Sequence, residues 1–409
     1  MTNILEVWLE GRHVGRFASG SEGAIAFVYD NDAPETPISL SLPRERQATR
    51  SAARNFLDNL LPDQAETRSR MATAYGAEST STLDLLARAG GDVAGGLVLL
   101  PEGQDLTNSL LELNPSSDRE IAERISAIKR DHDAWIPSDR PARFSLAGSQ
   151  GKFALAKIDG GWYWSNATVP STHIIKPARP ELPGLEQVEA ASLKLAATIG
   201  LKAPAASVLA VQGQTAYLVE RFDRVPGTSV AQRIHGEDFA QAMGVSPDAK
   251  YGLTAVQAIQ MLTTADPTNE LSYGFVEQLT FNVLLGNADA HAKNYSLLLR
   301  PTGIELAPIY DVVPVGLYPI YDQDLAMRIA GAHRPQAAEL SHWRKLARQA
   351  HLDEDRVADL VTGVAESLAD NNDSAWELLD DVQAEAMRAT VGRNTDKILA
   401  PNSETNLLS

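Results

Sequence analysis

The segment LLGNADAHAKNYSLLL, residues 284–299, contains the most informative spacing of polar residues in this chain. Asp289, His291 and Asn294 form the pattern D-x-H-x-x-N, and Asp311 follows at the end of IELAPIYD. Phosphoryl transfer needs one carboxylate that meets the incoming hydroxyl. It also needs an amide oxygen and a second carboxylate that hold Mg²⁺ against the triphosphate oxygens. The pattern therefore predicts Asp289 as the catalytic carboxylate and Asn294 with Asp311 as metal ligands.

An ordinary loop is the alternative interpretation of the same residues. Asp and Asn side chains often cap turns, so this spacing also occurs without any catalytic role. The position of Asp311 at the end of a predicted hairpin strand favours the catalytic interpretation, because it supplies a second carboxylate from a separate stretch of chain.

A lysine at the end of an apolar strand predicts a phosphate contact. Lys176 ends the β-branched run THIIK, and a buried lysine needs an anion, for which nucleotide phosphates are suitable. A helix glutamate orients such a lysine in protein kinases, and Glu189 is favoured over Glu186 for this role. The alternatives are a solvated edge-strand lysine and solvated glutamates.

Two further segments are candidate nucleotide contacts. In LAGSQGKFAL, residues 146–155, Gly148 and Gly151 allow backbone N–H groups to approach phosphates. The segment lacks the first glycine and the Lys-Ser/Thr pair of a Walker A loop. In YLVERFDR, residues 217–224, the backbone is suited to contact an adenine edge, although Arg221 with Asp223 or Arg224 can equally form a surface salt-bridge cluster.

Composition restricts the class of protein. The chain has 409 residues with 44% apolar residues, which predicts two or three globular domains. The absence of cysteine excludes thiolate metal sites, thiol nucleophiles and disulfides. A net charge of −17 argues against a free-standing nucleic-acid binder. The N-terminal residues do not resemble a signal peptide, and no apolar run of membrane-spanning length occurs, so we expect a soluble cytoplasmic protein with no membrane contact.

The pattern of apolar residues predicts two lobes. Strands are expected within residues 3–30 and at 37–43, followed by helical spacing over 51–76 that Pro62 interrupts. A polar linker is expected at 102–120, strands return over 143–225, and helices dominate beyond residue 230. The hairpin around Pro301-Thr302-Gly303 is the exception in this last part.

The order of these segments resembles the HipA family, the serine/threonine kinase toxins of bacterial toxin–antitoxin pairs. The matching pieces are FSLAGSQGKFAL, HIIKPA, VERFDR, LLGNADAHAKNYSLLL, LAPIYDVVP and LAMRIAG, with EVWLEGRHVGRF as a less specific match. The resemblance implies an α+β, two-lobed, protein-kinase-like fold related to lipid kinases. It would have a mixed α/β N-terminal lobe and an all-α C-terminal lobe. The expected parts are a strand-rich subdomain (1–105), a nucleotide-binding α/β part (106–225), an all-α catalytic lobe (226–400) and a flexible tail (401–409).

The resemblance also implies ATP and Mg²⁺ as cofactors and a role for each matching residue. Lys176 would touch the phosphates, Glu220 and Phe222 would hold adenine through their backbones, and Asp223 would reach the ribose. The remaining expected nucleotide contacts are Ala147, Gly148, Ser149, Gln150, Lys152, His291 and Lys293, beside Asn294 and Asp311. Ser145 matches the autophosphorylated serine whose modification pulls the phosphate loop out, and Ser149 is the alternative. Gly151 stands where the family pattern has an acidic residue.

The resemblance also implies partners for this chain. They are a small HipB-like helix-turn-helix antitoxin and, through it, the operator DNA of a self-repressed operon, and the best-known substrate is glutamyl-tRNA synthetase. Two other functions remain open. One is an aminoglycoside- or choline-type small-molecule phosphotransferase, whose cationic substrate would suit an acidic protein. The other is a corepressor module with secondary kinase activity.

Overall fold

The computed structural model describes residues 3–20, 23–45, 48–107, 109–137 and 143–400. These residues divide into two compact units. Unit 1 comprises the described residues of Met1–Glu186, Pro204–Lys250 and Tyr295–Ala307; unit 2 comprises those of Gln187–Ala203, Tyr251–Asn294 and Pro308–Ser409. Within these described ranges, no helix is both long and apolar enough to cross a membrane. The expected flexible tail, 401–409, lies outside the described residues, and the expected domain boundaries stay predictions.

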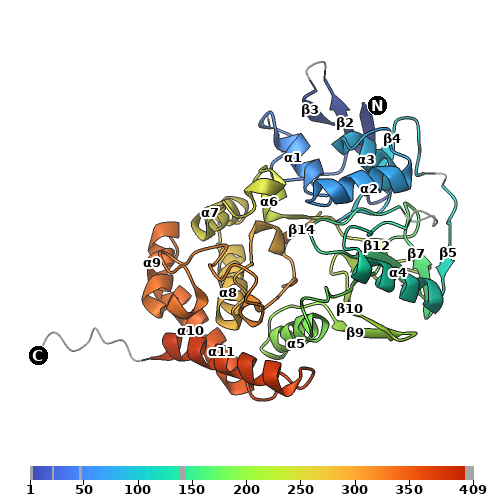
Figure 1. Cartoon of the computed structure of the whole chain (residues 1–409). Coiled ribbons are helices and arrows are strands. Elements are labelled where there is room, and N and C mark those ends of the chain that lie inside the picture. Colours follow the sequence, from blue (N-terminus) through green and yellow to red (C-terminus); the bar gives the residue numbers. More distant parts are fainter. Residues whose placement is uncertain (1–2, 21–22, 46–47, 108, 138–142, 401–409) are drawn as a thin grey trace, which may run out of the picture. The chain divides into compact units, whose positions relative to one another are not determined.

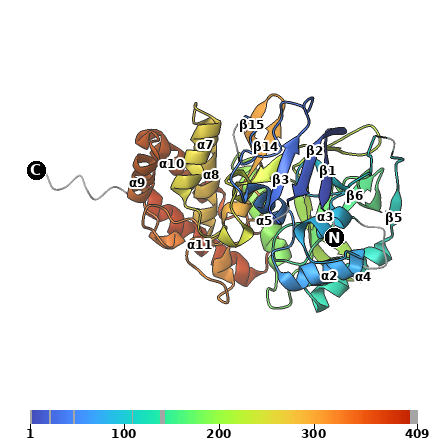
Figure 2. The same cartoon turned by 90° about the horizontal axis from the view of Figure 1, so that it is seen from above.

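The first part of unit 1 is a four-stranded antiparallel sheet in the order β3-β2-β1-β4, in which β1, β2 and β3 lie side by side (Figure 2). Its strands are β1 (Ile4–Leu9), β2 (Arg12–Ser19), β3 (Ile25–Tyr29) and β4 (Leu97–Pro101). Glu10 and Gly11 both have positive φ, as a two-residue hairpin turn requires. Alternate residues Leu5, Val7 and Leu9 are buried in one core with Phe56 of the helix that follows. The strands predicted within 3–30 are therefore confirmed.

Three helices belong to the same core: α1 (Ala52–Asp58), α2 (Ala65–Tyr75) and α3 (Thr82–Ala89). The helical structure is interrupted between α1 and α2 around Pro62, as predicted, because proline has no N–H for the helical hydrogen bonds. The strand predicted at 37–43 is wrong. There Ser39 Oγ and the Leu40 N–H donate to the Glu237 carboxyl, at 2.5 and 2.9 Å, so side-chain partners replace a neighbouring strand.

The second sheet of unit 1 has six antiparallel strands in the order β5-β7-β6-β8-β10-β9. Its strands are β5 (Asn114–Ser116), β6 (Phe153–Ile158), β7 (Gly161–Trp164), β8 (His173–Lys176), β9 (Ala206–Val211) and β10 (Gln214–Glu220). Helix α4 (Asp118–Arg130) packs on this sheet through Ile121, Ile125 and Ile128. The predicted linker at 102–120 thus ends in an edge strand and in the Ser117–Glu120 capping box of α4. Since β8 lies between β6 and β10, Lys176 stands on a central strand.

The remaining strands of unit 1 show that residues 226–400 are not all helical. They are β11 (Arg224–Val225), β12 (Gln232–Arg233), β13 (Gly236–Asp238), β14 (Ser296–Arg300) and β15 (Gly303–Leu306), with the short helix α6 (Phe239–Ala242) after β13. The hairpin β14–β15 confirms the predicted turn at Pro301-Thr302-Gly303. Its partner β13 lies far away in sequence, so the pairing depends on tertiary contacts that no local pattern encodes.

The regular elements of unit 2, in its described part, are helices. They are most of α5 (Leu185–Thr198), then α7 (Ala255–Ala265), α8 (Glu270–Leu285), α9 (Leu340–Ala350), α10 (Glu354–Asn371) and α11 (Asp381–Leu399), joined by segments with single 3₁₀ turns. Helix α10 packs against α8, α9 and α11 (Figure 1). Helix α8 is apolar around most of its circumference, which is typical of a buried helix. Its C-terminal end is where the D-x-H-x-x-N segment begins.

Candidate active site

A compact loop carries the D-x-H-x-x-N pattern. Helix α8 ends at Gly286, whose φ of 81° places it in the left-handed conformation that closes a helix. The loop then folds on itself, because the His291 N–H donates to the Asp289 carbonyl (2.7 Å) and the Asn294 N–H to the His291 carbonyl (2.9 Å). The small side chains of Ala288, Ala290 and Ala292 are buried beneath it. Asp289 is left exposed at the tip of the loop.

Asn294 and Asp311 come together as predicted. The Asn294 amide Nδ2 donates to Asp311 Oδ2 at 3.0 Å, and Asp311 has a positive φ of 57°. Asn287, at the other end of the same loop, lies near the Asp311 carbonyl, with Nδ2 3.4 Å away. Both ends of the loop that carries Asp289 therefore contact Asp311.

The amide oxygen of Asn294 is suited to bind a cation. Asn294 is 5% exposed, and its Oδ1 has no hydrogen-bond partner among the described residues. A buried polar atom left without a partner costs about 1–3 kcal/mol, so an oxygen in this position fits a ligand. No group of three or more His, Asp or Glu residues suited to a metal occurs in the described ranges. An ion here would depend on Asn294, Asp311, phosphate oxygens and water, which is the usual environment of Mg²⁺.

Tyr251 contacts the predicted catalytic carboxylate. Its hydroxyl donates to Asp289 Oδ1 at 2.8 Å, and its ring meets His291 edge-on with 5.0 Å between centroids. The side chain itself is exposed. Sequence reasoning missed Tyr251, because it lies well before the catalytic loop and the surrounding residues KYGLT carry no catalytic pattern.

Among the residues expected to contact a nucleotide, Lys176 is buried at the end of β8. Its Nζ lies 5.5 Å from the centroid of the Tyr217 ring, in register on β10. Of the two glutamates on α5, Glu186 accepts from the Ala178 N–H (3.2 Å) and lies 3.4 Å from Lys129 Nζ. Glu189 is buried and belongs to unit 2, and its predicted pairing with Lys176 stays a prediction.

The glycine loop is held closed by hydrogen bonds to other parts of unit 1. Ser145 is 0% exposed, and its hydroxyl donates to the Leu60 carbonyl at 2.7 Å. The Asp63 N–H donates to the Gly148 carbonyl at 3.1 Å. Lys152 Nζ donates to the Ala147 carbonyl at 2.9 Å, which closes the loop from within. Ser149 is exposed, so the two candidate phosphorylation sites differ sharply in accessibility.

The packing around Gly151 explains the departure from the expected acidic residue. A Cβ atom at Gly151 would lie 2.6 Å from Ile128 Cγ2 and 2.9 Å from the His132 carbonyl oxygen. These distances leave no room for any side chain. The loop of this chain therefore requires glycine here, because α4 and the residues that follow it pack directly against the backbone.

Asp223 belongs to a buried ion cluster. Arg221 Nε and Nη2 donate to the two Asp223 oxygens, at 2.9 and 2.7 Å, and the Gly95 N–H donates to Oδ2 at 2.7 Å. Arg224 Nη2 donates to the buried Asp92 at 2.9 Å. Burial alone would raise the pKa of Asp223, but Arg221 and Arg224 hold it well below its usual range. The carboxylate thus stabilises a cluster that is buried and not on the surface, and the expected ribose contact of Asp223 stays a prediction.

The two expected adenine contacts occupy different environments. The Glu220 N–H donates to the Ala205 carbonyl at 2.9 Å, so only its carbonyl is left to serve an adenine. Phe222 packs against an apolar cluster of Ile234, Leu298 and Ala307. The predicted roles of both residues toward adenine stay predictions.

Comparisons with known proteins identify the same family as the sequence motifs do. Residues 5–100 match the HipA N-terminal domain, and residues 144–372 match the HipA-like C-terminal domain. The chain is 35% identical to the putative kinase Y4mE of Sinorhizobium fredii, over 90% of this chain and 91% of the relative. It is 28% identical to the serine/threonine-protein kinase toxin HipA of Shewanella oneidensis, over 82% of this chain and 81% of the relative.

A solved structure shows the same fold. In the complex of Shewanella oneidensis HipA with HipB and its operator DNA, a chain superimposes on this one with a TM-score of 0.83 at 25% identity, and 97% of each chain is covered.

Proposed function

The chain belongs to the HipA family, and from this premise we propose that it is an ATP-dependent serine/threonine protein kinase of a toxin–antitoxin pair. The observation that carries the proposal is the pairing of Asn294 with Asp311 beneath a loop that exposes Asp289. These are the three groups that phosphoryl transfer requires. The absence of cysteine agrees with a cytoplasmic location, where ATP is available and thiols are kept reduced.

Each residue has a distinct role in this proposal. Asp289 orients the acceptor hydroxyl and takes its proton, while Tyr251 holds the carboxylate through Oδ1. Asn294 Oδ1 and the Asp311 carboxylate would hold Mg²⁺, which when bound neutralises charge on the phosphate oxygens. Lys176 supplies a buried positive charge for the phosphates.

The remaining nucleotide contacts are proposed from the family resemblance. They are the loop residues Ala147, Gly148, Ser149, Gln150 and Lys152, the Glu220 carbonyl and the Phe222 backbone, and His291 with Lys293 beside the catalytic loop. Lys293 is buried, and its carbonyl accepts from the Tyr310 hydroxyl at 2.8 Å. This bond ties the segment before Asp311 to the catalytic loop.

We propose Ser145 as the autophosphorylated residue. Its hydroxyl is buried on the Leu60 carbonyl, so a phosphate there cannot be accommodated in the closed loop, and the segment must leave its place. Loss of that closed loop would inactivate the kinase. Incubation with ATP followed by phosphopeptide mapping should place the phosphate on Ser145. Phosphate on Ser149 in wild type, or undiminished labelling of Ser145→Ala, would assign the site elsewhere.

The proposed partner is a HipB-like antitoxin with a helix-turn-helix fold, through which the pair would bind operator DNA and repress its own operon. The support is the structural likeness to the HipA of the HipA–HipB–operator complex. A protein substrate such as glutamyl-tRNA synthetase is part of the same proposal.

Labelled ATP tests the kinase assignment. The wild-type chain should incorporate phosphate into protein, and Asp289→Ala should lower the rate by at least about 100-fold, because a positioned carboxylate contributes on that scale. Asp359→Ala, which removes an exposed carboxylate on α10, is the matched control and should retain full activity. Equal rates for Asp289→Ala and wild type would remove the assignment. Transfer to small polycations but never to protein would favour a small-molecule phosphotransferase.

A further inference from the structure

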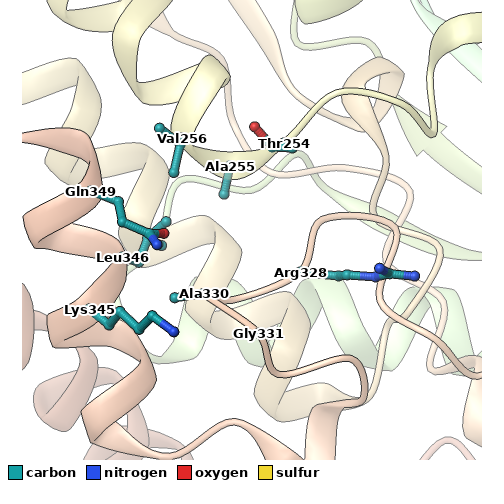
Figure 3. A pocket seen from close by; sticks show the side chains of 9 residues that line it. All are labelled: Thr254, Ala255, Val256, Arg328, Ala330, Gly331, Lys345, Leu346 and Gln349. Carbon is teal, nitrogen blue, oxygen red and sulfur yellow. The ribbon is translucent and has the colours of Figure 1, made fainter.

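A cavity of about 340 Å³ lies in unit 2 outside the groups already assigned (Figure 3). Three segments form its wall: the first turn of α7, the loop that contains LAMRIAG (325–331), and one face of α9. The lining residues are Thr254, Ala255, Val256, Arg328, Ala330, Gly331, Lys345, Leu346 and Gln349. The LAMRIAG segment is a family-like motif to which the kinase proposal gives no role.

Two walls of the cavity are connected by hydrogen bonds to the loop that carries Asp289. The Ala326 N–H donates to the Ala288 carbonyl at 2.8 Å, so the segment that carries Arg328 is bonded to the residue before Asp289. On the other wall, Thr254 follows shortly after Tyr251, whose hydroxyl holds Asp289. A polypeptide that presents a hydroxyl to Asp289 would therefore have this cavity within reach of its neighbouring residues.

The lining carries positive charge and no carboxylate. Arg328 and Lys345 are exposed, and neither forms an ion pair within the described part of the chain. Two other cations of α9, Arg344 and Arg348, do form ion pairs, with carboxylates of α10. The first N–H groups of α7 add positive potential, because a helix leaves them without intrahelical acceptors. On a chain of net charge −17, the lining of this cavity is locally positive.

The shape of the lining favours an extended acidic segment over a compact phosphate. Figure 3 shows Lys345 reaching toward Ala330, while the Arg328 side chain extends away from Lys345. A phosphate ion needs donors that converge on one point. Two cations that diverge in this way, on a lining that also presents Val256 and Leu346, instead suit carboxylates spaced along a chain, with side-chain methylene groups against the apolar residues.

Resting on the proposed kinase function, we propose that this cavity binds acidic side chains of the protein substrate, close in sequence to the serine or threonine that is phosphorylated. The cavity would then select substrates by charge, and Arg328 and Lys345 would be specificity-determining residues. The cavity would also attract acidic segments, which the net negative charge of the protein would otherwise repel. This attraction would weaken as the salt concentration rises.

Binding without ATP tests the proposal independently of catalysis. A fluorescein-labelled serine peptide with flanking Glu and Asp is compared with its Gln and Asn counterpart by fluorescence anisotropy, using the full chain. Wild type should bind the acidic peptide about tenfold more tightly, since two exposed ion pairs contribute on that scale. The double variant R328E/K345E should lose this difference. Lys397→Glu, a charge reversal on the exposed face of α11, should retain it.

The second arm measures the ratio of kcat/KM for the two peptides. Wild type should prefer the acidic peptide through a lower KM, and R328E/K345E should reduce the ratio to one or invert it. Lys345→Gln, which keeps the helix and removes one charge, should give an intermediate ratio, and thermal melting checks that each variant is folded. Equal binding of both peptides by wild type, or a preference that survives the double reversal, overturns the proposal.

Two results distinguish an acidic-peptide site from a phosphate site and from the kinase activity itself. Competition by inorganic phosphate as strong as that by the acidic peptide would overturn the peptide assignment and identify a phosphate site. Selective peptide binding without any phosphate incorporation would leave the cavity assignment standing and count against the kinase function.

Discussion

At the scale of single residues, Tyr251 directly contacts Asp289, the predicted catalytic carboxylate. Its hydroxyl donates to one carboxylate oxygen, Oδ1. Its ring also meets His291, so one side chain connects two members of the D-x-H-x-x-N pattern. We interpret Tyr251 as a positioning residue that acts through Asp289.

We predict that Tyr251→Phe lowers kcat about fivefold and leaves the KM for ATP unchanged. The change removes one hydrogen bond, which is worth about 1 kcal/mol, and keeps the ring contact with His291. Steady-state kinetics check this, with Tyr163→Phe on β7 as the control. A rise in kcat would contradict the prediction and show that the hydroxyl competes with the substrate.

Gly151 illustrates how packing dictates one residue type. We predict that Gly151→Asp lowers the free energy of unfolding by about 2 kcal/mol or more, because the new side chain collides with Ile128 and with the His132 carbonyl. Gly363→Ala on α10 is the matched control. Its Cβ meets nothing within 4 Å, and it should be neutral or stabilising. Denaturant unfolding measures both, and an unaffected Gly151→Asp would contradict this tight packing.

At the scale of elements, a buried carboxyl joins β13 to the segment that precedes α1. Glu237 accepts from Ser39 Oγ and from the Leu40 N–H. Burial raises the pKa of Glu237 to about 8, although its hydrogen bonds with Ser39 and Leu40 lower it in part. The folded chain therefore keeps a proton on Glu237 that the unfolded chain releases near pH 4.5.

This difference predicts the direction of a pH effect. Between about pH 4.5 and 8 the folded state binds more protons at this site than the unfolded state does, so the contribution of Glu237 to stability falls as pH rises. The slope is about 1.4 kcal/mol per pH unit at most. Glu237→Gln cannot ionise and should remove this slope. Denaturant unfolding from pH 5 to pH 8 checks it, and parallel stability curves for wild type and variant would contradict the prediction.

At the scale of the whole molecule, net charge governs contact with DNA. The charge of −17 opposes phosphate binding, so we predict that the isolated chain does not retard operator DNA at physiological salt. Addition of the proposed HipB-like antitoxin should produce retardation, because the basic contacts would come from that partner. An electrophoretic mobility assay measures this. A salt-resistant shift by the chain alone would contradict the prediction.

The accuracy of the predictions made from sequence depended on how far apart in the chain the contacting residues lie. The β1–β2 hairpin, the break at Pro62 and the β14–β15 hairpin were predicted because turn residues and period-two patterns are local signals. The strand at 37–43 was predicted wrongly, because its alternating pattern was real but its partner was the side chain of Glu237. The buried partners of Asp223 were not all predicted, because Gly95 lies far away in sequence, and the expected ribose contact of Asp223 stays a prediction.

The order of short motifs along the sequence was sufficient to indicate the family. The sequence also predicted the loop that presents Asp289 ahead of Asn294, because a few adjacent residues with small side chains favour a tight turn. Tertiary structure alone decided that Tyr251 holds Asp289, that Ser145 is buried against Leu60, and that Arg328 and Lys345 line one cavity. The physical reason is that such contacts join segments far apart in the chain, and only the packing of the buried core determines which of them meet.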